Sequence, residues 1–281
     1  FTLSKDKILT NTGTINNDST FINFGGIITS NILINTATFE NYDSIVNTGT
    51  LTTSGIFNNH DSLTLRGSIG RITNKNNFTI SGTFTNKANI RNDSIMTLSN
   101  NSTFKNDSYL INNTNATFNI EGAFTNDSTF INNGSINIKR TGVFTLVKDS
   151  LLINPSSTFV NEGRIENNAL SRLINKSEFV NKGGLVNKGK IENDNIMTHE
   201  GDSTLNNKEY ILNNGTFTNN GYILNEDSII NTGTGTFKHL DNQFNNQGVF
   251  KNVLATSILQ IDSTMTVSGA LGKIVNNGII K

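Results

Sequence analysis

Few residues in this sequence have the type and spacing that chemistry requires. The three histidines, His60, His199 and His239, could bind a metal ion or act as bases only if the fold brought them together. They lie far apart in the sequence, so we expect separate histidines at solvated surface positions. The chain has no Cys, which excludes thiolate nucleophiles, disulfides and cysteine-based zinc sites. We therefore expect no metal site.

Two glycine-rich stretches, 232–235 and 268–273, could be taken for phosphate-binding loops. The second ends in Gly-Lys, but its spacing is wrong for a P-loop, and Ile274 follows where a P-loop has Ser or Thr. No helix is expected after either stretch to bind phosphate at its N-terminus. Both are predicted to be turns, and we expect no cofactor.

Composition excludes further classes. The chain has 22 Lys plus Arg and 22 Asp plus Glu, which gives no electrostatic reason to bind nucleic acid or an anionic membrane. No apolar run approaches the ~20 residues that span a bilayer. The sequence begins at Phe1 rather than Met, which suggests a processed precursor without its signal segment, although a cropped sequence would look the same.

The dominant pattern is a short repeat rich in Asn, which occurs 50 times. From Ile8 onward the chain divides into about forty units of six to nine residues. A unit has an apolar residue, an Asn two positions later, and then Gly, Ser or Asp; residues 215–227 hold two such units. The period is too short for a helix, and the β-branched and aromatic residues between the turns favour strands.

A longer period of about twenty residues contains three of these units. One series of Phe recurs every twenty residues, at Phe84, Phe104, Phe124 and Phe144. A second series has steps of 18 to 23 residues, with Ile136 in its one gap, and contains Phe21, Phe39, Phe57, Phe78, Met96, Phe118, Phe159, Phe179, Met197, Phe217 and Phe237.

Such a unit is one coil of an all-β, single-stranded parallel β-helix, or β-solenoid. We predict three short strands and about 20 residues per coil, and a single domain of about fourteen coils over residues 1–281. Each strand turns its apolar residue inward, and coils stack at the ~4.8 Å strand spacing, which places equivalent residues in columns. The variable length of the units favours a right-handed over a left-handed helix.

The Asn of each unit is predicted to lie at a corner of the coil and to point inward. Its amide can donate to one coil and accept from the next, so we expect a buried ladder that includes Asn86, Asn106 and Asn126. Asn and the Gly, Asp or Ser that follows also suit the turn itself.

The pattern in Asn133-Gly134-Ser135-Ile136 and Asn214-Gly215-Thr216-Phe217 resembles the repeats of filamentous-haemagglutinin-type adhesins. It is also similar to that of Asn-rich, adhesin-like surface proteins of bacteria and archaea. The resemblance covers nearly the whole chain. It implies a secreted right-handed parallel β-helix that works by contact rather than chemistry, and it carries over no site residues.

The main alternative from another class is a polysaccharide-processing β-helix enzyme. Such enzymes build a cleft from long loops, whereas the longest unit here exceeds six residues by only two or three. The acidic residues fall mostly at expected turns. We therefore expect no catalytic residues and no enzyme activity.

Asn-x-Ser/Thr sequons are candidate glycosylation sites, because the turns of a secreted solenoid are exposed. They lie at Asn17, Asn77, Asn92, Asn100, Asn101, Asn106, Asn112, Asn115, Asn126, Asn133, Asn175 and Asn214.

On one face the residue after the inward apolar one is repeatedly aliphatic rather than polar. By strand alternation we predict an outward apolar column that contacts another copy or a partner, although β propensity on a solvated face would give the same pattern. Its members are Ile34, Ile111, Ile131, Ile153, Ile174, Leu212 and Val275.

The chain stops inside a repeat, so it is either cut from a longer adhesin or stacks its ends on other subunits. Ile279 and Ile280 are therefore candidate assembly residues that would meet the first coil of another copy, near Phe1 to Ile15. We expect a structural subunit of an extracellular cell-surface fibre or filament. Its partners would be copies of itself, with other surface components or glycans as further partners; the alternative is the stalk of a large adhesin.

Overall fold

The computed structural model is an all-β parallel β-solenoid of about 14 turns, with roughly 20 residues per turn. It describes residues 1–65 and 71–281, and the residues in these two ranges form no helix. A typical strand pairs in parallel with the strand three places further along the chain, so three strands make one coil. The fold class predicted from the sequence is confirmed.

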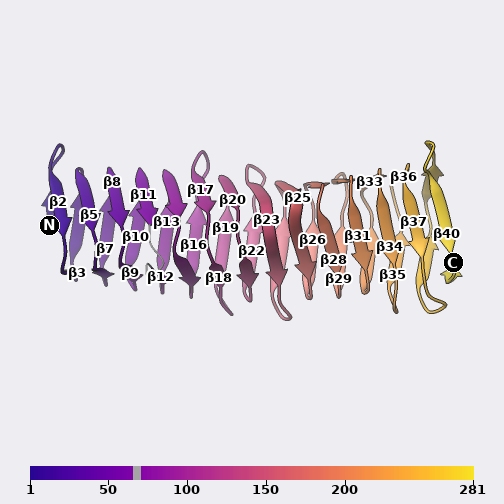
Figure 1. Ribbon diagram of the computed structural model, residues 1–281, viewed down its shortest axis with the longest axis horizontal. Coiled ribbons are helices and arrows are strands. Elements are labelled where there is room, and N and C mark those ends of the chain that lie inside the picture. Colours follow the sequence, from indigo (N-terminus) through magenta and orange to yellow (C-terminus); the bar gives the residue numbers. More distant parts are fainter. Residues whose placement is uncertain (66–70) are drawn as a thin grey trace. The chain divides into compact units, whose positions relative to one another are not determined.

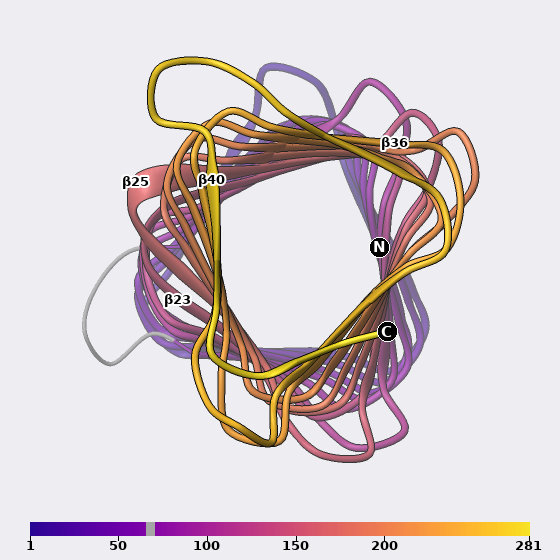
Figure 2. The ribbon, with the colours of Figure 1, turned by 90° about the vertical axis from the view of Figure 1, so that its right-hand side faces the viewer.

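Contacts group the residues into two units, Phe1–Phe144 and Thr145–Lys281, and each is a stack of three-strand coils (Figure 1). The strand β23 (Val143–Ile153) begins in the first unit and continues in the second. Viewed along the stack, the coils of each unit follow nearly the same closed outline, with a few turns projecting from it (Figure 2).

The strands of the first unit form three columns, and the members of a column pair with one another along the stack. The first column contains β1 (Thr2–Leu3), β4 (Thr20–Asn23), β7 (Thr38–Asn41), β10 (Ile56–Asn59), β13 (Asn77–Ile80), β16 (Ile95–Leu98), β19 (Thr117–Ile120) and β22 (Ser135–Ile138). The second contains β2 (Ile8–Asn11), β5 (Gly26–Thr29), β8 (Ser44–Asn47), β11 (Ser62–Leu65), β14 (Thr83–Asn86), β17 (Thr103–Asn106) and β20 (Ala123–Asn126). The third contains β3 (Thr14–Asn17), β6 (Ile32–Asn35), β9 (Thr50–Thr53), β12 (Arg71–Asn74), β15 (Asn89–Asn92), β18 (Leu110–Asn112) and β21 (Phe130–Asn132).

The strands of the second unit also form three columns. The first contains β24 (Thr158–Asn161), β26 (Glu178–Asn181), β29 (Ile196–His199), β32 (Thr216–Asn219), β35 (Thr236–His239), β38 (Ile258–Ile261) and β41 (Ile279–Ile280). The long strand β25 (Arg164–Asn175) belongs to both other columns, because it pairs with β27 (Gly184–Asn187) through its first half and with β28 (Lys190–Asn193) through its second. The second column continues with β27 (Gly184–Asn187), β30 (Thr204–Asn207), β33 (Tyr222–Asn225), β36 (Gln243–Asn246) and β39 (Thr264–Val267). The third continues with β28 (Lys190–Asn193), β31 (Tyr210–Asn213), β34 (Ser228–Asn231), β37 (Val249–Asn252) and β40 (Lys273–Asn276).

Columns of stacked apolar residues form the core. Phe84, Phe104, Phe124 and Phe144 are fully buried, and the ring centroids of successive members lie 4.5, 4.8 and 5.0 Å apart. The second predicted series is also in register within each unit; in the first, for example, Phe21 pairs with Phe39 and Phe118 with Ile136. The aromatic columns predicted from the sequence are therefore confirmed.

The turns stack almost as closely as the strands, which restricts the residues that follow the corners. A Cβ atom on Gly49 would lie 1.7 Å from the carbonyl oxygen of Asn31, and one on Gly55 would lie 2.0 Å from that of Ala37. Only Gly can hold the chain this near the preceding coil without moving its backbone.

Replacement of Phe124 by Ala is expected to lower the free energy of unfolding by roughly 3 to 5 kcal/mol, because it leaves a cavity between the rings of Phe104 and Phe144. Replacement of Ile95 by Ala is the control, because Ile95 is an exposed residue at the start of β16. It should change the free energy of unfolding by no more than about 0.5 kcal/mol. Urea unfolding followed by circular dichroism measures both variants. Equal effects of the two substitutions would contradict the stacked core.

Candidate functional site

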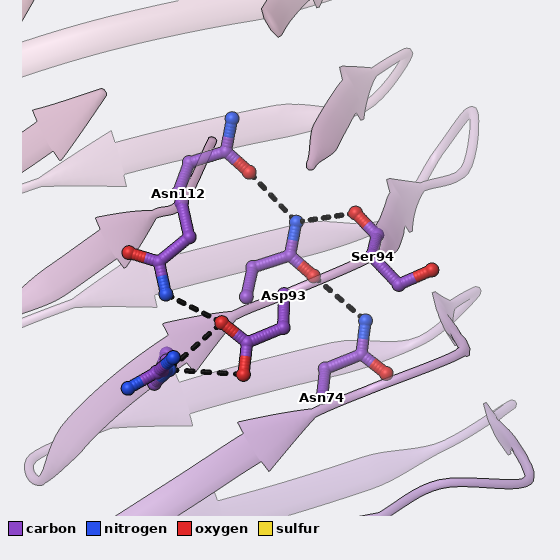
Figure 3. Close-up of polar contacts among 7 residues, drawn as sticks. Asn74, Asp93, Ser94 and Asn112 are labelled. Carbon is purple, nitrogen blue, oxygen red and sulfur yellow. Dashed lines mark hydrogen bonds and ion pairs between the residues drawn. The ribbon is translucent and has the colours of Figure 1, made fainter. Parts of the chain in front are cut away.

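The most regular polar feature of the interior is a ladder of Asn side chains at the corners of the coils. The Nδ2 atom of Asn74 donates to Oδ1 of Asn92 at 2.7 Å, and Asn92 donates in turn to Asn112 at 2.7 Å (Figure 3). Asn92 Nδ2 also donates to the carbonyl oxygen of Ser94 at 3.0 Å, so the same amide closes the turn of its own coil. Each amide thus links its coil to the next and holds one corner.

The predicted ladder through Asn86, Asn106 and Asn126 is confirmed. All three side chains are fully buried, and the two Nδ2–Oδ1 distances are 2.6 and 2.7 Å. Asn86 Oδ1 also accepts from the backbone N–H of Ala88 at 3.0 Å, and its Nδ2 donates to the carbonyl of Ala88 at 2.7 Å. Both ends of the buried amide are therefore satisfied.

At one corner, four consecutive coils have an aliphatic residue in place of the ladder Asn. Ile80, Leu98, Ile120 and Ile138 occupy the corner of consecutive coils in the first column of the first unit, and all are fully buried. Replacing both partners of a hydrogen bond by apolar groups leaves no polar group unpaired. The corner therefore accepts a column of amides or a column of aliphatic side chains.

Two histidines are part of the ladder, so the expectation of solvent-exposed His199 and His239 is wrong. Both are fully buried, and each stacks in register on an Asn of the preceding coil. Nδ1 of His199 lies 2.8 Å from Nδ2 of Asn181, and Nδ1 of His239 lies 2.9 Å from Nδ2 of Asn219. His60 is exposed as expected, and its Nε2 lies 2.8 Å from a carboxylate oxygen of Glu40.

The ladder fixes the tautomer of these two rings. Because an Asn Nδ2 can only donate, Nδ1 of His199 must accept, and its Nε2–H then donates to the carbonyl oxygen of Tyr222 at 3.1 Å. His239 repeats this arrangement with the carbonyl oxygen of Thr264 at 2.8 Å. Burial away from water lowers the pKa of His199 to about 4 and also lowers the pKa of His239.

The outward aliphatic residues share a column in each unit, but the column is not continuously apolar. In the first unit Ile111 and Ile131 are neighbours, while Arg91 precedes them. In the second unit Glu192 lies between Ile174 and Leu212. Val275 follows Lys251, and Ile34 lies between Asn16 and Thr52. The candidate assembly surface is therefore a set of short apolar patches separated by polar residues, and its role in assembly stays a prediction.

Ile153 does not belong to that surface, which corrects the sequence prediction. Its side chain is fully buried, as is that of Leu151, whereas Leu152 between them is half-buried. Alternation along β23 therefore places Leu152 on the outward side. Ile153 takes a corner position that Asn occupies in most coils.

The two assembly candidates near the end of the sequence differ in orientation. Ile280 pairs with Leu259, a buried core residue, so it continues a core column. Ile279 pairs with Ile258 at the first, outward position of the strand. Of these two residues, Ile280 therefore has the inward, core position and Ile279 the outward one.

Half of the predicted glycosylation sites lie inside the fold. Asn17, Asn92, Asn106, Asn112, Asn126 and Asn175 are buried ladder residues. A glycan on Nδ2 would remove a ladder donor and has no space in the core. The prediction of glycosylation at these six residues is therefore wrong. Exposed or half-buried positions hold Asn77, Asn100, Asn101, Asn115, Asn133 and Asn214, where glycosylation stays a prediction.

A surface feature that the sequence analysis missed is a stack of three exposed rings in the first unit. Phe24 and Tyr42 are stacked with their centroids 5.1 Å apart, and Tyr42 and His60 with theirs 4.4 Å apart. A hollow of about 530 Å³ beside them is lined by Thr2, Ser4, Lys5, Asp43 and Asp61, together with Phe24 and Tyr42. The signal was present, because each ring directly follows a ladder Asn at 18-residue spacing.

Among the residues that the structure describes, no three His, Asp or Glu side chains are placed to hold a metal ion. Within the same ranges, no helix is long and apolar enough to cross a membrane. No protein-family model, curated protein or solved structure matches this chain. The fold class therefore stands on the chain's own register and hydrogen bonds.

Replacement of Asn106 by Leu is expected to cost on the order of 1 to 3 kcal/mol, because it removes the acceptor of Asn86 and the donor to Oδ1 of Asn126 along the ladder. The matched control is Asn77→Leu at an exposed position, which should change stability by no more than about 0.5 kcal/mol. Denaturant unfolding at neutral pH measures both. A neutral effect of Asn106→Leu would show that the ladder adds nothing to stability.

His199 should make the fold sensitive to acid. Its pKa is about 4 in the folded chain against 6.5 as the ordinary value, so between these values the unfolded chain binds more protons. Stability from this group is complete above pH 6.5 and falls by roughly 3 kcal/mol as the pH drops to about 4. His199→Asn should flatten this part of the curve. Parallel pH curves of unfolding free energy for the two proteins would rule out the effect.

Proposed function

We propose that this chain is a structural protein of an extracellular, cell-surface fibre or filament, and that it assembles with copies of itself by continuing the stack of coils. The proposal concerns contact and support rather than catalysis. It treats the coil-to-coil interface within one chain as the template for the interface between chains.

The observation that carries the proposal is the repetition of one interface through each unit. Junctions within each unit use parallel strand pairing and core columns, and many add hydrogen bonds between corner amides, as at Phe104 on Phe84 and Asn106 on Asn86. The upper surface of one coil is complementary to the lower surface of the next. An interface of this head-to-tail kind generates an open filament when it forms between copies and does not close a ring.

The first and last coils present surfaces of the same kind. Ile274 and Ile280 are exposed although their partners in the preceding coil, Phe250 and Leu259, are fully buried. In the first coil Phe1 is exposed, and Leu9 and Ile15 are half-buried although their partners Ile27 and Leu33 are fully buried. A further coil of a longer chain would cover such surfaces, and so would a coil of another copy.

Lateral contact is supported by the short apolar patches on the outward column. Ile111 and Ile131 form one, and Leu212 and Ile230 form another. Two or three residues of this size bury little area, so they favour side-by-side contact only when many copies repeat it along a filament.

The extracellular location is supported by the resemblance of the Asn-rich repeat to adhesin-like surface proteins. That resemblance also supports the second candidate, a stalk segment of a large adhesin. In a stalk the same coil surfaces would be covered by further coils of one chain, and no filament of separate copies would form.

The filament proposal is tested by Ile280→Lys. A Lys on the open coil surface would have to lose its hydration where another coil packs, so fibres should shorten or vanish at concentrations at which the unsubstituted chain forms them. Ile196→Lys is the matched control, since Ile196 is 44% exposed and Ile280 is 55% exposed, both in strands of the first column. Negative-stain microscopy and sedimentation measure fibre length, and circular dichroism reports the fold.

Normal fibres from Ile280→Lys would exclude this coil surface as the contact. An unsubstituted chain that stays monomeric at high concentration would exclude the filament and leave the adhesin stalk. Equal loss of fibres with Ile196→Lys would mean that added charge, rather than its position, controls assembly.

A further inference from the structure

The hollow beside the three stacked rings combines an exposed aromatic surface with free polar groups of both kinds. We propose that it binds a neutral pyranose unit of an oligosaccharide. This inference goes beyond the proposed assembly, because it concerns a corner of one unit and requires no second copy.

The charges around the hollow argue against an anionic ligand. Asp43 and Asp61 place two carboxylates there and Lys5 one ammonium group, which leaves a net negative charge, while the ammonium group offsets part of the attraction for a cation. In the part of the chain that the structure describes, Lys5 forms no ion pair and the carboxylate of Asp61 accepts no hydrogen bond. One oxygen of Asp43 accepts from the backbone N–H of Ser44 at 2.6 Å, which orients its carboxylate.

The polar groups also match the hydrogen bonding of a sugar. Each hydroxyl of a pyranose both donates and accepts, so a site for it needs donors and acceptors close together. The ammonium of Lys5 donates, the carboxylates of Asp43 and Asp61 accept, and the hydroxyl of Tyr42 does both. A ligand with acceptors only, or with donors only, would leave half of these groups unpaired.

The ring of Phe24 offers the apolar surface that a pyranose face requires. One face of Phe24 stacks on Tyr42, and the register of Leu3 with Asn23 places the small Ser4 beside Phe24 in the preceding coil. Of the aromatic rings in the described ranges, only Tyr42 stacks on Phe24. The electron-rich face of an aromatic ring attracts the partly positive C–H bonds on the apolar side of a sugar ring.

The far end of the ring stack is held in place by hydrogen bonds. His60 stacks on Tyr42, and its Nε2 lies 2.8 Å from Glu40. Glu40 accepts a second bond, at 2.8 Å, from Nδ2 of Asn58. The strands that directly precede the three rings pair in register, so the rings are ordered before a ligand arrives, which reduces the entropy lost on binding.

The size of the hollow agrees with this ligand class. Its volume of about 530 Å³ lies within the ~300 to 1,000 Å³ usual for small-molecule sites. It opens on the surface beside consecutive coils. A sugar chain can therefore extend beyond the unit that contacts Phe24.

The test uses an array of neutral, sialylated and sulfated oligosaccharides, followed by calorimetry with the neutral oligosaccharide that binds most strongly. Phe24→Ala and Phe24→Leu remove the ring, the second with little loss of apolar volume, and Asp61→Ala removes an acceptor. Tyr222→Ala is the matched control, because Tyr222 is 41% exposed and Phe24 is 43% exposed. Circular dichroism checks that each variant keeps the fold.

We expect binding to neutral oligosaccharides that weakens about tenfold or more in both Phe24 variants and in Asp61→Ala, and that is unchanged in Tyr222→Ala. Binding should also be nearly insensitive to salt between ~0.05 and ~0.5 M, since screening affects only charged ligands strongly. Retention of charged oligosaccharides alone would overturn the proposal. The same holds if no oligosaccharide binds, if folded Phe24 variants bind normally, or if Tyr222→Ala binds as weakly as they do.

Discussion

The hydrogen bond between Asn side chains of successive coils is the interaction on which the rest of this structure depends. An amide has a donor end and an acceptor end, and an amide within a run of Asn, such as Asn92, uses its Oδ1 toward the coil before it and its Nδ2 toward the coil after it. This works only when the strands are parallel and in register. A slip by one residue would turn the amides to solvent and the outward side chains into the core. The stacking of the Phe columns therefore follows from the same register that the amides require.

The requirement applies to the column rather than to the single residue. Four consecutive coils of the first unit replace Asn by Ile or Leu at one corner and leave no polar group unpaired, as with Ile80 and Leu98. His199 meets the requirement differently, because Nδ1 takes the place of the amide oxygen. Its single N–H is used by a carbonyl oxygen, so it has no donor left for Asn219 in the next coil. The ladder therefore runs as far as His199 and begins again at Asn219. The residue at this break, His199, is the one whose pKa burial lowers to about 4.

Most of the fold could be predicted from the sequence, because the spacing of apolar residues and Asn in the repeat identifies the residues that point inward. An apolar residue and the residue two places later point to the same side, which gave both the Phe columns and the Asn ladder. The same rule applied to Met197-Thr198-His199 predicts that His199 points inward and lies in the ladder. Applied to Phe104-Lys105-Asn106, it predicts that the sequon residue Asn106 is buried. Those two errors came from reading His and Asn by residue type instead of by position. Ile153 is different, because Leu151, Leu152 and Ile153 are all aliphatic and their sequence alone leaves the alternation undecided.

The candidate site could not be predicted in the same way, because outward positions are under no packing constraint. Phe24, Tyr42 and His60 lie just after ladder residues, where other coils carry Ser, Asp or Lys, and only the stacking of coils brings the three rings together. The solenoid therefore separates two kinds of position. Inward positions are set by the next coil and make the chain able to extend itself. Outward positions vary freely, and rings or charges placed there at one-coil spacing become adjacent, so a binding surface can arise without any change to the core.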